Sequence, residues 1–291
     1  PGRMEVYKSV SRQVHEIFHE YTDLIEPLAL DEAFLDVTEN KQGILLAVDI
    51  AKAIKQRIRE ELSLVASAGV SYNKFLAKIA SDFRKPDGLC TIHPDQAIDF
   101  IARLPIESFW GVGPVTARKM HLLGIHNGLQ LRECSSEMLV RQFGKVGLLY
   151  YDFARGVDLR PVEAVRIRKS IGCEHTLEKD IHVRSSVIIE LYHVATELVE
   201  RLQQKEFRGN TLTLKIKFHD FSQITRSMTQ AQELTNLERI LPLAKQLLKE
   251  VEYEQHPIRL IGLSVSNPRE EADEHRGVWE QLSFEFSDWG K

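Results

Sequence analysis

The sequence predicts an α+β chain of several domains, and three observations carry that prediction. Short apolar strand patterns alternate with amphipathic helices up to residue 94, which favours a mixed α/β layer. Strand patterns then disappear between Pro94 and Gly156, where short helices separated by glycine and proline predict an all-helical unit. From Ser170 to Ser266 the patterns follow a β-α-β-β-α-β order, which is the split βαβ arrangement.

The first region predicts helices wherever apolar residues recur at steps of three and four. Pro27 ends the first helical pattern, Ser71 is a suitable N-cap for a later helix, and Lys85–Gly88 has the composition of a turn. In chain order, we expect a helix over 6–21, an extended stretch over 28–37, a helix over 44–62, a strand over 64–70, a helix over 71–83 and a strand over 89–92.

The last region follows a polar, proline-containing linker over 157–169 that ends in basic residues. Periods of two and of 3.6 residues alternate after this linker, and Pro268 ends the pattern. The expected elements are a strand over 170–175, a helix over 185–204, strands over 211–218 and 224–228, a helix over 237–251 and a strand over 258–266.

The composition fits a folded chain and excludes several classes of protein. The 291 residues are 43% hydrophobic and 27% charged, which excludes a disordered or collagen-like chain. The sequence has no run of about 18 uncharged apolar residues, so it predicts no membrane span. Cys90, Cys134 and Cys173 stand too far apart for a C-x-x-C metal knuckle, and they favour a reducing cytoplasm.

The formal net charge of −4 argues at first against a nucleic-acid ligand, because lysine and arginine supply most phosphate binding. The distribution of charge weakens this objection. Residues 1–94 carry a net charge of −2, residues 95–268 carry +2 and residues 269–291 carry −4. The net charge of the C-terminal segment therefore equals that of the whole chain. Residues 1–268 have no net charge, and a chain with balanced charges can still present a basic face.

Asp31 and Glu32 are the first candidate site, because adjacent carboxylates in an apolar stretch need a compensating positive charge. Mg²⁺ prefers carboxylate oxygens as ligands. Neighbouring side chains on a strand point to opposite faces, so a shared metal requires a bend or hairpin tip at Asp31. The alternative is an exposed strand end with solvated acids, which the pair taken alone favours.

The segment from Ala68 to Gly88 is the second candidate. A strand, a tight turn and a helix start bring backbone N–H groups together, which suits a phosphate. Lys74, Lys78 and Lys85 add positive charge, and Lys85 lies in an extended segment because proline follows it. The alternative is a solvated helix face, and we expect that alternative for Lys78.

A Gly-Val-Gly turn defines the third candidate, because it joins a short helix to a second helix that begins at Pro114. Glycine lets the backbone approach a partner closely, and free N–H groups at a helix start can bind phosphate. This is a helix-hairpin-helix pattern, which binds nucleic-acid backbone without reading its sequence. The alternative is a plain αα-hairpin. The candidate DNA contacts are Gly111, Val112, Gly113, Thr116 and Lys119.

Basic residues at the end of the linker and on later strands form a fourth group. Lys215 and Lys217 are two residues apart, so they share one face of a strand. Such a face could lie against phosphates, and an ordinary solvated sheet face explains it equally well. The group consists of Arg166, Arg168, Lys169, Lys215, Lys217 and Arg226.

The C-terminal segment contains apolar residues within an acidic stretch. Leu282, Phe284 and Phe286 follow Gln281 at spacings typical of short peptides that dock in a hydrophobic groove of a partner. The alternative is that these side chains fold back onto the chain.

Together these motifs resemble the Y-family translesion DNA polymerases, most closely those of the bacterial DNA polymerase IV type. The resemblance implies that Asp31 and Glu32 lie at a hairpin tip and bind Mg²⁺, and that Lys85 contacts the incoming triphosphate. It implies that Gln281–Phe286 binds a sliding clamp. The implied domains are a palm over 1–94, a thumb with a helix-hairpin-helix over 95–163, a little finger over 164–268 and an acidic tail over 269–291.

The resemblance also implies an activity: addition of deoxynucleotides to a primer 3′ end by two-Mg²⁺ phosphoryl transfer, in DNA repair and lesion bypass. The partners would be primer-template DNA, deoxynucleoside triphosphates and a sliding clamp, for a cytoplasmic monomer. Nothing before Asp31 matches the family's further metal-binding aspartate or its fingers, so we expect this chain alone to be inactive. The alternatives are a non-catalytic DNA- and clamp-binding module and a helix-hairpin-helix repair nuclease.

Overall fold

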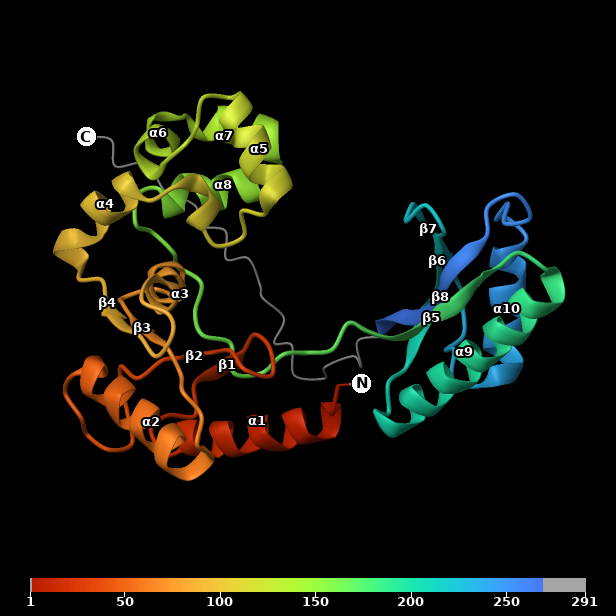
Figure 1. Ribbon diagram of the computed structural model, residues 1–291, viewed down its shortest axis with the longest axis horizontal. Helices are drawn as coiled ribbons and strands as arrows, with labels where there is room; N and C mark the ends of the chain where they lie inside the picture. Colours follow the sequence, from red (N-terminus) through yellow and green to blue (C-terminus); the bar gives the residue numbers. More distant parts are fainter. Residues whose placement is uncertain (1, 269–291) are drawn as a thin grey trace, which may run out of the picture. The chain divides into compact units, whose positions relative to one another are not determined.

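The computed structural model describes residues 2–268, and the chain forms two compact units (Figure 1). The first unit ends at Arg166 and the second begins at Ile167. Within the described range, every helix is too short or too polar to cross a lipid bilayer.

The first unit begins with two amphipathic helices that pack together, α1 (Met4–His19) and α2 (Ala47–Leu62). Their apolar stripes meet around Ile17, Ile50 and Ile54, each less than a tenth exposed. Burial of such a stripe, more than intrinsic helix propensity, stabilises helices of this length. The periodicity over 6–21 and 44–62 therefore predicted both helices correctly.

Two small sheets connect these helices to the rest of the unit. Strands β1 (Ile25–Pro27) and β2 (Ala33–Leu35) pair antiparallel, whereas β3 (Ala68–Val70) and β4 (Leu89–Thr91) pair parallel. The prediction of one extended stretch over 28–37 is wrong, because residues 28–32 form the loop of a hairpin between β1 and β2.

Helix α3 (Lys74–Phe83) begins later than predicted. Its N-cap is Asn73, whose side-chain oxygen accepts a hydrogen bond from the Leu76 N–H at 3.0 Å. The prediction of Ser71 as the N-cap is wrong, because the Ser71 hydroxyl donates to the Ile92 carbonyl at 2.9 Å. Ser71 therefore extends the pairing of β3 with β4, and the helix starts only where the chain leaves that sheet.

The region from Pro94 to Phe153 is all-helical, as predicted. Phe75 of α3 stacks on Phe153 with ring centroids 4.1 Å apart, so the mixed α/β part and the helical part share one core. The elements are α4 (Pro94–Arg103), a 3-10 turn (Ile106–Ser108), α5 (Pro114–Leu122), α6 (Gly128–Glu133), α7 (Ser136–Phe143) and α8 (Val146–Phe153).

The second unit has the predicted β-α-β-β-α-β order. Its sheet has the strand order β5-β8-β6-β7, and every neighbouring pair is antiparallel. The elements are β5 (Ser170–Ile181), α9 (Arg184–Gln204), β6 (Gly209–Phe218), β7 (Gln223–Thr229), α10 (Leu237–Leu248) and β8 (Ile258–Pro268).

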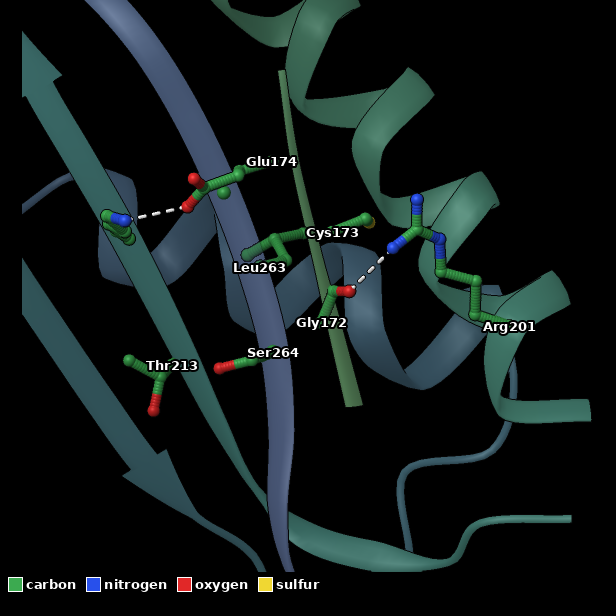
Figure 2. Close-up of a pocket in the computed structure, with 9 residues that line it drawn as sticks. Gly172, Cys173, Glu174, Arg201, Thr213, Leu263 and Ser264 are labelled. Atoms are coloured by element: carbon green, nitrogen blue, oxygen red, sulfur yellow. Dashed lines mark hydrogen bonds and ion pairs between the residues drawn. The ribbon is translucent and has the colours of Figure 1, made fainter. Parts of the chain in front are cut away.

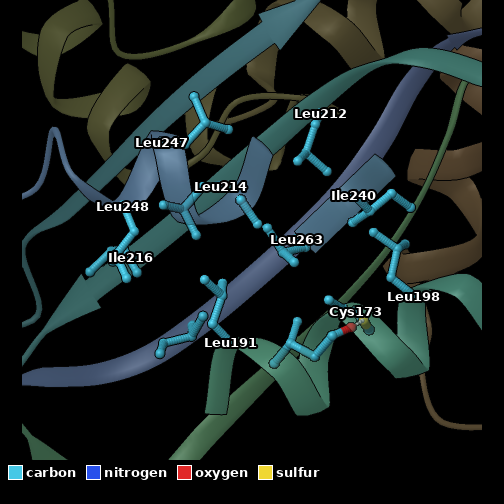
Figure 3. Packing of buried hydrophobic residues seen from close by; sticks show 14 of the residues in the cluster. Cys173, Leu191, Leu198, Leu212, Leu214, Ile216, Ile240, Leu247, Leu248 and Leu263 are labelled. Atoms are coloured by element: carbon cyan, nitrogen blue, oxygen red, sulfur yellow. Dashed lines mark hydrogen bonds between the residues drawn. The ribbon is translucent and has the colours of Figure 1, made fainter. Parts of the chain in front are cut away.

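Helices α9 and α10 cover one face of this sheet and leave the other face open (Figures 1 and 3). Leu191 and Leu198 of α9 pack with Leu214 and Leu263 of the sheet in a fully buried core. Strand β5 is longer than predicted, since its pairing with β8 resumes at Ile181 after a register shift. The predicted α+β multidomain fold is confirmed.

Candidate functional site

Asp31 and Glu32 lie at the tip of the β1–β2 hairpin, where a shared ligand requires them to be. The N–H groups of Leu28 and Ala29 both donate to the Glu32 carbonyl, at 2.8 and 3.2 Å, and so close the tip tightly. Asp31 is exposed and the Glu32 side chain is 38% exposed. Both residues therefore lie in the turn between the two strands and not within a regular strand.

Phe34 anchors the hairpin to the helical region. It is 7% exposed, and its ring meets the Trp110 ring edge-on with centroids 5.3 Å apart. This contact fixes the orientation of β2, and hence of the carboxylates that precede it.

Lys78 contacts the hairpin tip. Its ammonium donates to Glu32 Oε1 at 3.0 Å and lies 3.5 Å from Asp82 Oδ2. The expectation of a solvated Lys78 is wrong: the side chain is only 17% exposed, because its face of α3 is turned toward the hairpin. A lysine at that depth needs a negative partner, and Glu32 supplies it.

Asp82 links this pair to Lys85, whose ammonium lies 2.6 Å from Asp82 Oδ1. Burial alone would raise the pKa of the Asp82 carboxyl. The hydrogen bond from Lys85 and the charge of Lys78 together have the larger, opposite effect, so the pKa of Asp82 is lowered overall. The same hydrogen bond, helped by the charges of Glu32 and Asp31, raises the pKa of Lys85. Carboxylates and ammonium groups thus form one connected charge cluster.

The donors at the hairpin tip fit a divalent cation only in part. Over residues 2–268, no group of three or more histidine, cysteine, aspartate or glutamate side chains is arranged to hold a metal. Asp31 and Glu32 supply two carboxylates, and Mg²⁺ commonly takes one or two carboxylates together with substrate phosphates and water. The tip therefore suits a cation shared with a bound triphosphate, and it does not suit a cage built by protein alone.

The N-terminus of α3 is occupied by the protein itself, so the expectation that it faces a phosphate is wrong. The Phe75 N–H donates to Asp158 Oδ2 at 3.0 Å. Arg160 grips the same carboxylate with two hydrogen bonds, at 2.7 and 2.8 Å. A buried carboxylate at a helix start stabilises the helix dipole, which leaves this end closed to another anion.

Lys74 is buried beside this contact and is also paired. Its ammonium donates to Glu26 at 2.5 Å and to the Pro161 carbonyl at 2.8 Å, and it is only 8% exposed. The N–H of Glu163 donates to the same Glu26 carboxylate at 2.9 Å. Residues 158–163 are thereby anchored to α3 and β1.

The Gly-Val-Gly turn precedes α5 as predicted. Gly111 has φ of +87°, a left-handed conformation that favours glycine, and Gly113 is the N-cap of α5. Val112 between them is 8% exposed and anchors the turn in the core. A depression of about 400 Å³ beside the turn is lined by Glu107, Val112, Gly113, Pro114, Ala117, Arg118 and His121.

Thr116 lies in the first turn of α5, half-buried, and Lys119 follows on the same helix. Lys119 donates to the Gln142 carbonyl, and its ammonium lies 5.0 Å from the Phe143 ring centroid. The side chain is therefore partly engaged at the end of α7, while its residue remains exposed.

Lys215 and Lys217 lie on the open face of the second unit's sheet. The Lys215 ammonium donates to Glu174 at 2.7 Å, and the Lys217 ammonium lies 5.0 Å from the Phe221 ring centroid. Arg226, the other strand residue predicted to contact DNA, does not share this face. It pairs in register with the buried Leu214, which places it on the helix-covered side, 3.7 Å from Glu250.

The open face also has a feature that its charged residues did not predict: a shallow depression of about 310 Å³ beside Lys215 (Figure 2). Two of the eight strand residues that line it, Gly172 and Gly262, carry no side chain, and Thr213 and Ser264 are small. Hydroxyl pairs continue across the face, with Thr211 to Thr229 at 2.9 Å and Thr213 to Ser227 at 2.8 Å. Alternating threonine and serine on two adjacent strands was the available signal.

The remaining candidates divide between the linker and the tail. Arg166, Arg168 and Lys169 are exposed and belong to no helix or strand. Gln281, Leu282, Phe284 and Phe286 lie outside the described residues.

Comparison with known proteins adds three family matches. The impB/mucB/samB family matches residues 1–82, the IMS family HHH motif matches 94–125, and the impB/mucB/samB family C-terminal domain matches 168–282.

Among curated relatives, DNA polymerase IV of Akkermansia muciniphila is 60% identical over 285 residues, which cover 98% of this chain and 79% of that protein. DNA polymerase IV of Leptospira interrogans is 47% identical over 94% of this chain and 77% of its own length.

Among solved structures, the Y-family DNA polymerase chimera Dbh-Dpo4(243-245)-Dbh has a TM-score of 0.84 at 27% identity, over 92% of this chain and 78% of that one. An insertion ternary complex of Dbh DNA polymerase has a TM-score of 0.60 at 27% identity, with the same coverage.

Proposed function

The chain belongs to the impB/mucB/samB family of Y-family polymerases, as a relative of DNA polymerase IV, and from that premise we propose how its residues divide the work of DNA synthesis. The activity is that of a DNA-directed DNA polymerase of the translesion type. The proposals below concern the metal, the nucleotide, the DNA and the clamp.

Asp31 and Glu32 hold Mg²⁺ against the triphosphate of the incoming nucleotide. The observation that supports this role is the hairpin tip, which carries both residues: Glu32 contacts Lys78, and the charges of both carboxylates act on Lys85. When bound, the metal would activate the primer 3′-hydroxyl and neutralise the leaving pyrophosphate. In the absence of the metal, the Lys78 ammonium supplies the positive charge that the Glu32 carboxylate needs.

Lys85 steadies the triphosphate. Its ammonium is 52% exposed, and it is held by Asp82 close to the two hairpin carboxylates. A lysine ammonium binds phosphate as a compact point charge. The exchange of Asp82 for a phosphate oxygen requires only a side-chain movement.

The helix-hairpin-helix and the open sheet face hold primer-template DNA by its backbone. Gly111 and Gly113 expose main chain at the start of α5, with Thr116 and Lys119 beside them. Lys215, Lys217 and the linker residues Arg166, Arg168 and Lys169 add positive charge. Small residues on the open face let a phosphate backbone approach closely.

We further propose that Gln281–Phe286 binds a sliding clamp, and that the protein is a cytoplasmic monomer. The support for the clamp is the sequence pattern, and the support for the compartment is that all three cysteines are unpaired within the described residues.

We also propose that the 291 residues alone extend a primer poorly. Two-metal transfer requires ligands that bridge both ions, and within residues 2–268 the hairpin tip contributes two carboxylates. The second candidate function is therefore a DNA- and clamp-binding module. The contact of Lys78 with Glu32 favours it, since that contact neutralises one proposed ligand.

Single-nucleotide primer extension with excess protein separates the two candidates. Under the polymerase proposal, Mg²⁺-dependent and template-directed extension is detectable, and Asp31→Asn or Glu32→Gln reduces it by about 10²- to 10³-fold without weakening DNA binding. Extension that survives both substitutions would refute the metal assignment. Salt-sensitive DNA binding with no extension at all would establish the binding module.

A further inference from the structure

The turn that carries Lys85 is held from behind by α2, and the contacts that hold it converge on Lys55. The Lys55 ammonium donates to the Asp87 carbonyl at 2.7 Å, to Asp87 Oδ1 at 3.0 Å and to the Gly88 carbonyl at 3.0 Å. An ammonium group has three N–H donors, and here all three are directed at two consecutive residues of one turn.

Lys55 differs from an ordinary surface lysine in its burial. Its side chain is 15% exposed, whereas Lys52, one turn earlier on the same helix, is 62% exposed and contacts only a residue of its own helix. The hydrogen bond from Lys55, together with its charge, lowers the pKa of the Asp87 carboxyl. Arg59 contacts the same carboxylate from a more exposed position.

The turn itself cannot adopt this shape freely. Asp87 has φ of +53°, in the left-handed region that most residues avoid, and a Cβ on Gly88 would lie 2.2 Å from the Arg84 carbonyl oxygen. The Ser67 hydroxyl accepts the Gly88 N–H at 3.1 Å, and the Gly88 carbonyl accepts the Ala68 N–H at 2.9 Å.

The backbone behind Lys85 is thus bound to β3 and α2, while the Lys85 side chain reaches forward to Asp82. We infer that Lys55 is a positioning residue for nucleotide binding. By fixing the carbonyls of Asp87 and Gly88, it sets the place from which the Lys85 ammonium meets a triphosphate. This inference rests on the proposed role of Lys85.

Nucleotide affinity tests the inference without requiring turnover. The protein is bound to primer-template DNA with a dideoxy-terminated primer, and the Kd for the next correct deoxynucleoside triphosphate is measured with Mg²⁺ by the fluorescence of a 2-aminopurine in the template. We expect Lys55→Met to weaken nucleotide binding by about tenfold, since a loosened support displaces the ligating group. DNA affinity should change by less than about twofold, as should both affinities for the control Lys52→Met.

A double-mutant cycle distinguishes positioning from general damage to the fold. If Lys55 acts through Lys85, then Lys55→Met in a Lys85→Ala background has no further effect on nucleotide Kd. The inference would be overturned if the two substitutions weakened nucleotide binding independently, so that their effects on Kd multiplied in the double variant. An unchanged nucleotide Kd in Lys55→Met alone would also overturn it. If Lys85→Ala alone leaves nucleotide Kd unchanged, the proposed role of Lys85 fails instead.

The conservative variant Lys55→Arg covers the case in which Lys55→Met does not fold. Its guanidinium keeps the charge but cannot repeat three hydrogen bonds converging on one nitrogen. We expect a folded protein with nucleotide Kd raised about threefold and DNA Kd unchanged. A wild-type nucleotide Kd in Lys55→Arg would count against the need for this geometry.

Discussion

The buried lysines of the first unit are arranged in the opposite way to the lysines on the open face of the second. Lys55 and Lys74 are largely buried, and each makes several hydrogen bonds to carboxylates and carbonyls. Lys215 and Lys217 project from a flat sheet among glycine, serine and threonine, with one carboxylate and one ring as their respective neighbours.

This difference separates two ways of binding phosphate. Under the proposed function, the nucleotide end would depend on a few charges held at fixed points, so the loss of one partner leaves another buried and unpaired. The DNA end would depend on a surface that lets a backbone approach, where each charge contributes modestly and is screened by salt.

Lys74→Met should destabilise the first unit by about 3 kcal/mol, because it leaves Glu26 partly buried without its cation. Chemical denaturation measures the loss. The matched control, Lys8→Met, removes an exposed pair with Glu5 and should cost less than about 1 kcal/mol. Equal losses for both variants would contradict the view that the first unit's lysines are structural anchors.

Gly262→Leu should weaken DNA binding by about tenfold, since its side chain fills the depression that a phosphate backbone would approach. A Cβ at this position lies 3.0 Å from the Cβ of Glu174, so the neighbouring side chain must also shift. Titration of labelled primer-template measures the change. The control is Thr225→Leu, because Thr225 lies on the edge strand β7, opposite Lys215. An equal loss of DNA affinity in this variant would argue against a specific role for the depression.

Lys215→Ala should weaken DNA binding about threefold and reduce the slope of log Kd against log salt by about 1, as expected for one lost phosphate contact. Arg226→Ala should change neither quantity, because Arg226 lies on the helix-covered side of the sheet. Affinity measured over a salt series gives both values. A larger effect at Arg226 would place DNA on the other side.

His175 should make the second unit slightly pH-dependent. Its ring nitrogens lie 2.6 Å from Glu197 and 2.6 Å from Glu190, and the hydrogen bond to Glu197 is the main cause of its raised pKa. Arg201 and His193 also face these carboxylates.

A raised folded-state pKa stabilises the fold fully below the unfolded value of 6.5, and that stability is lost as the pH rises through the folded value. Hydrogen exchange of β5 and α9, corrected for intrinsic rates, should therefore show less protection above this range. His175→Gln should remove the dependence. Protection that increases with pH would contradict the assigned direction.

The sequence predicted local structure well because periodicity and turn chemistry are local. The two helices before the site, the Gly-Val-Gly turn and the β-α-β-β-α-β order all follow from neighbours a few residues apart. The hairpin tip at Asp31 was expected from the resemblance to the Y-family polymerases, because the residues alone showed only that a shared ligand would require a bend there.

The errors involve partners that are distant in sequence. Lys78 meets Glu32 across 46 residues, and Asp158 reaches the start of α3 across 83. Neither contact produces a periodic pattern in the sequence from which it could be predicted. The face on which Arg226 lies could not be predicted, because strand register decides the side, and a shift of one residue reverses it.

The anchoring of residues 158–163 has a consequence for how the two units cooperate. With that stretch fixed by Asp158, Lys74 and Glu26, the free tether shortens to the exposed residues from Ala164 to Lys169. Six residues reach at most about 20 Å. If both units bind a duplex as proposed, binding by one unit would present the duplex to the other at a high effective concentration, so two weak contacts would give avidity.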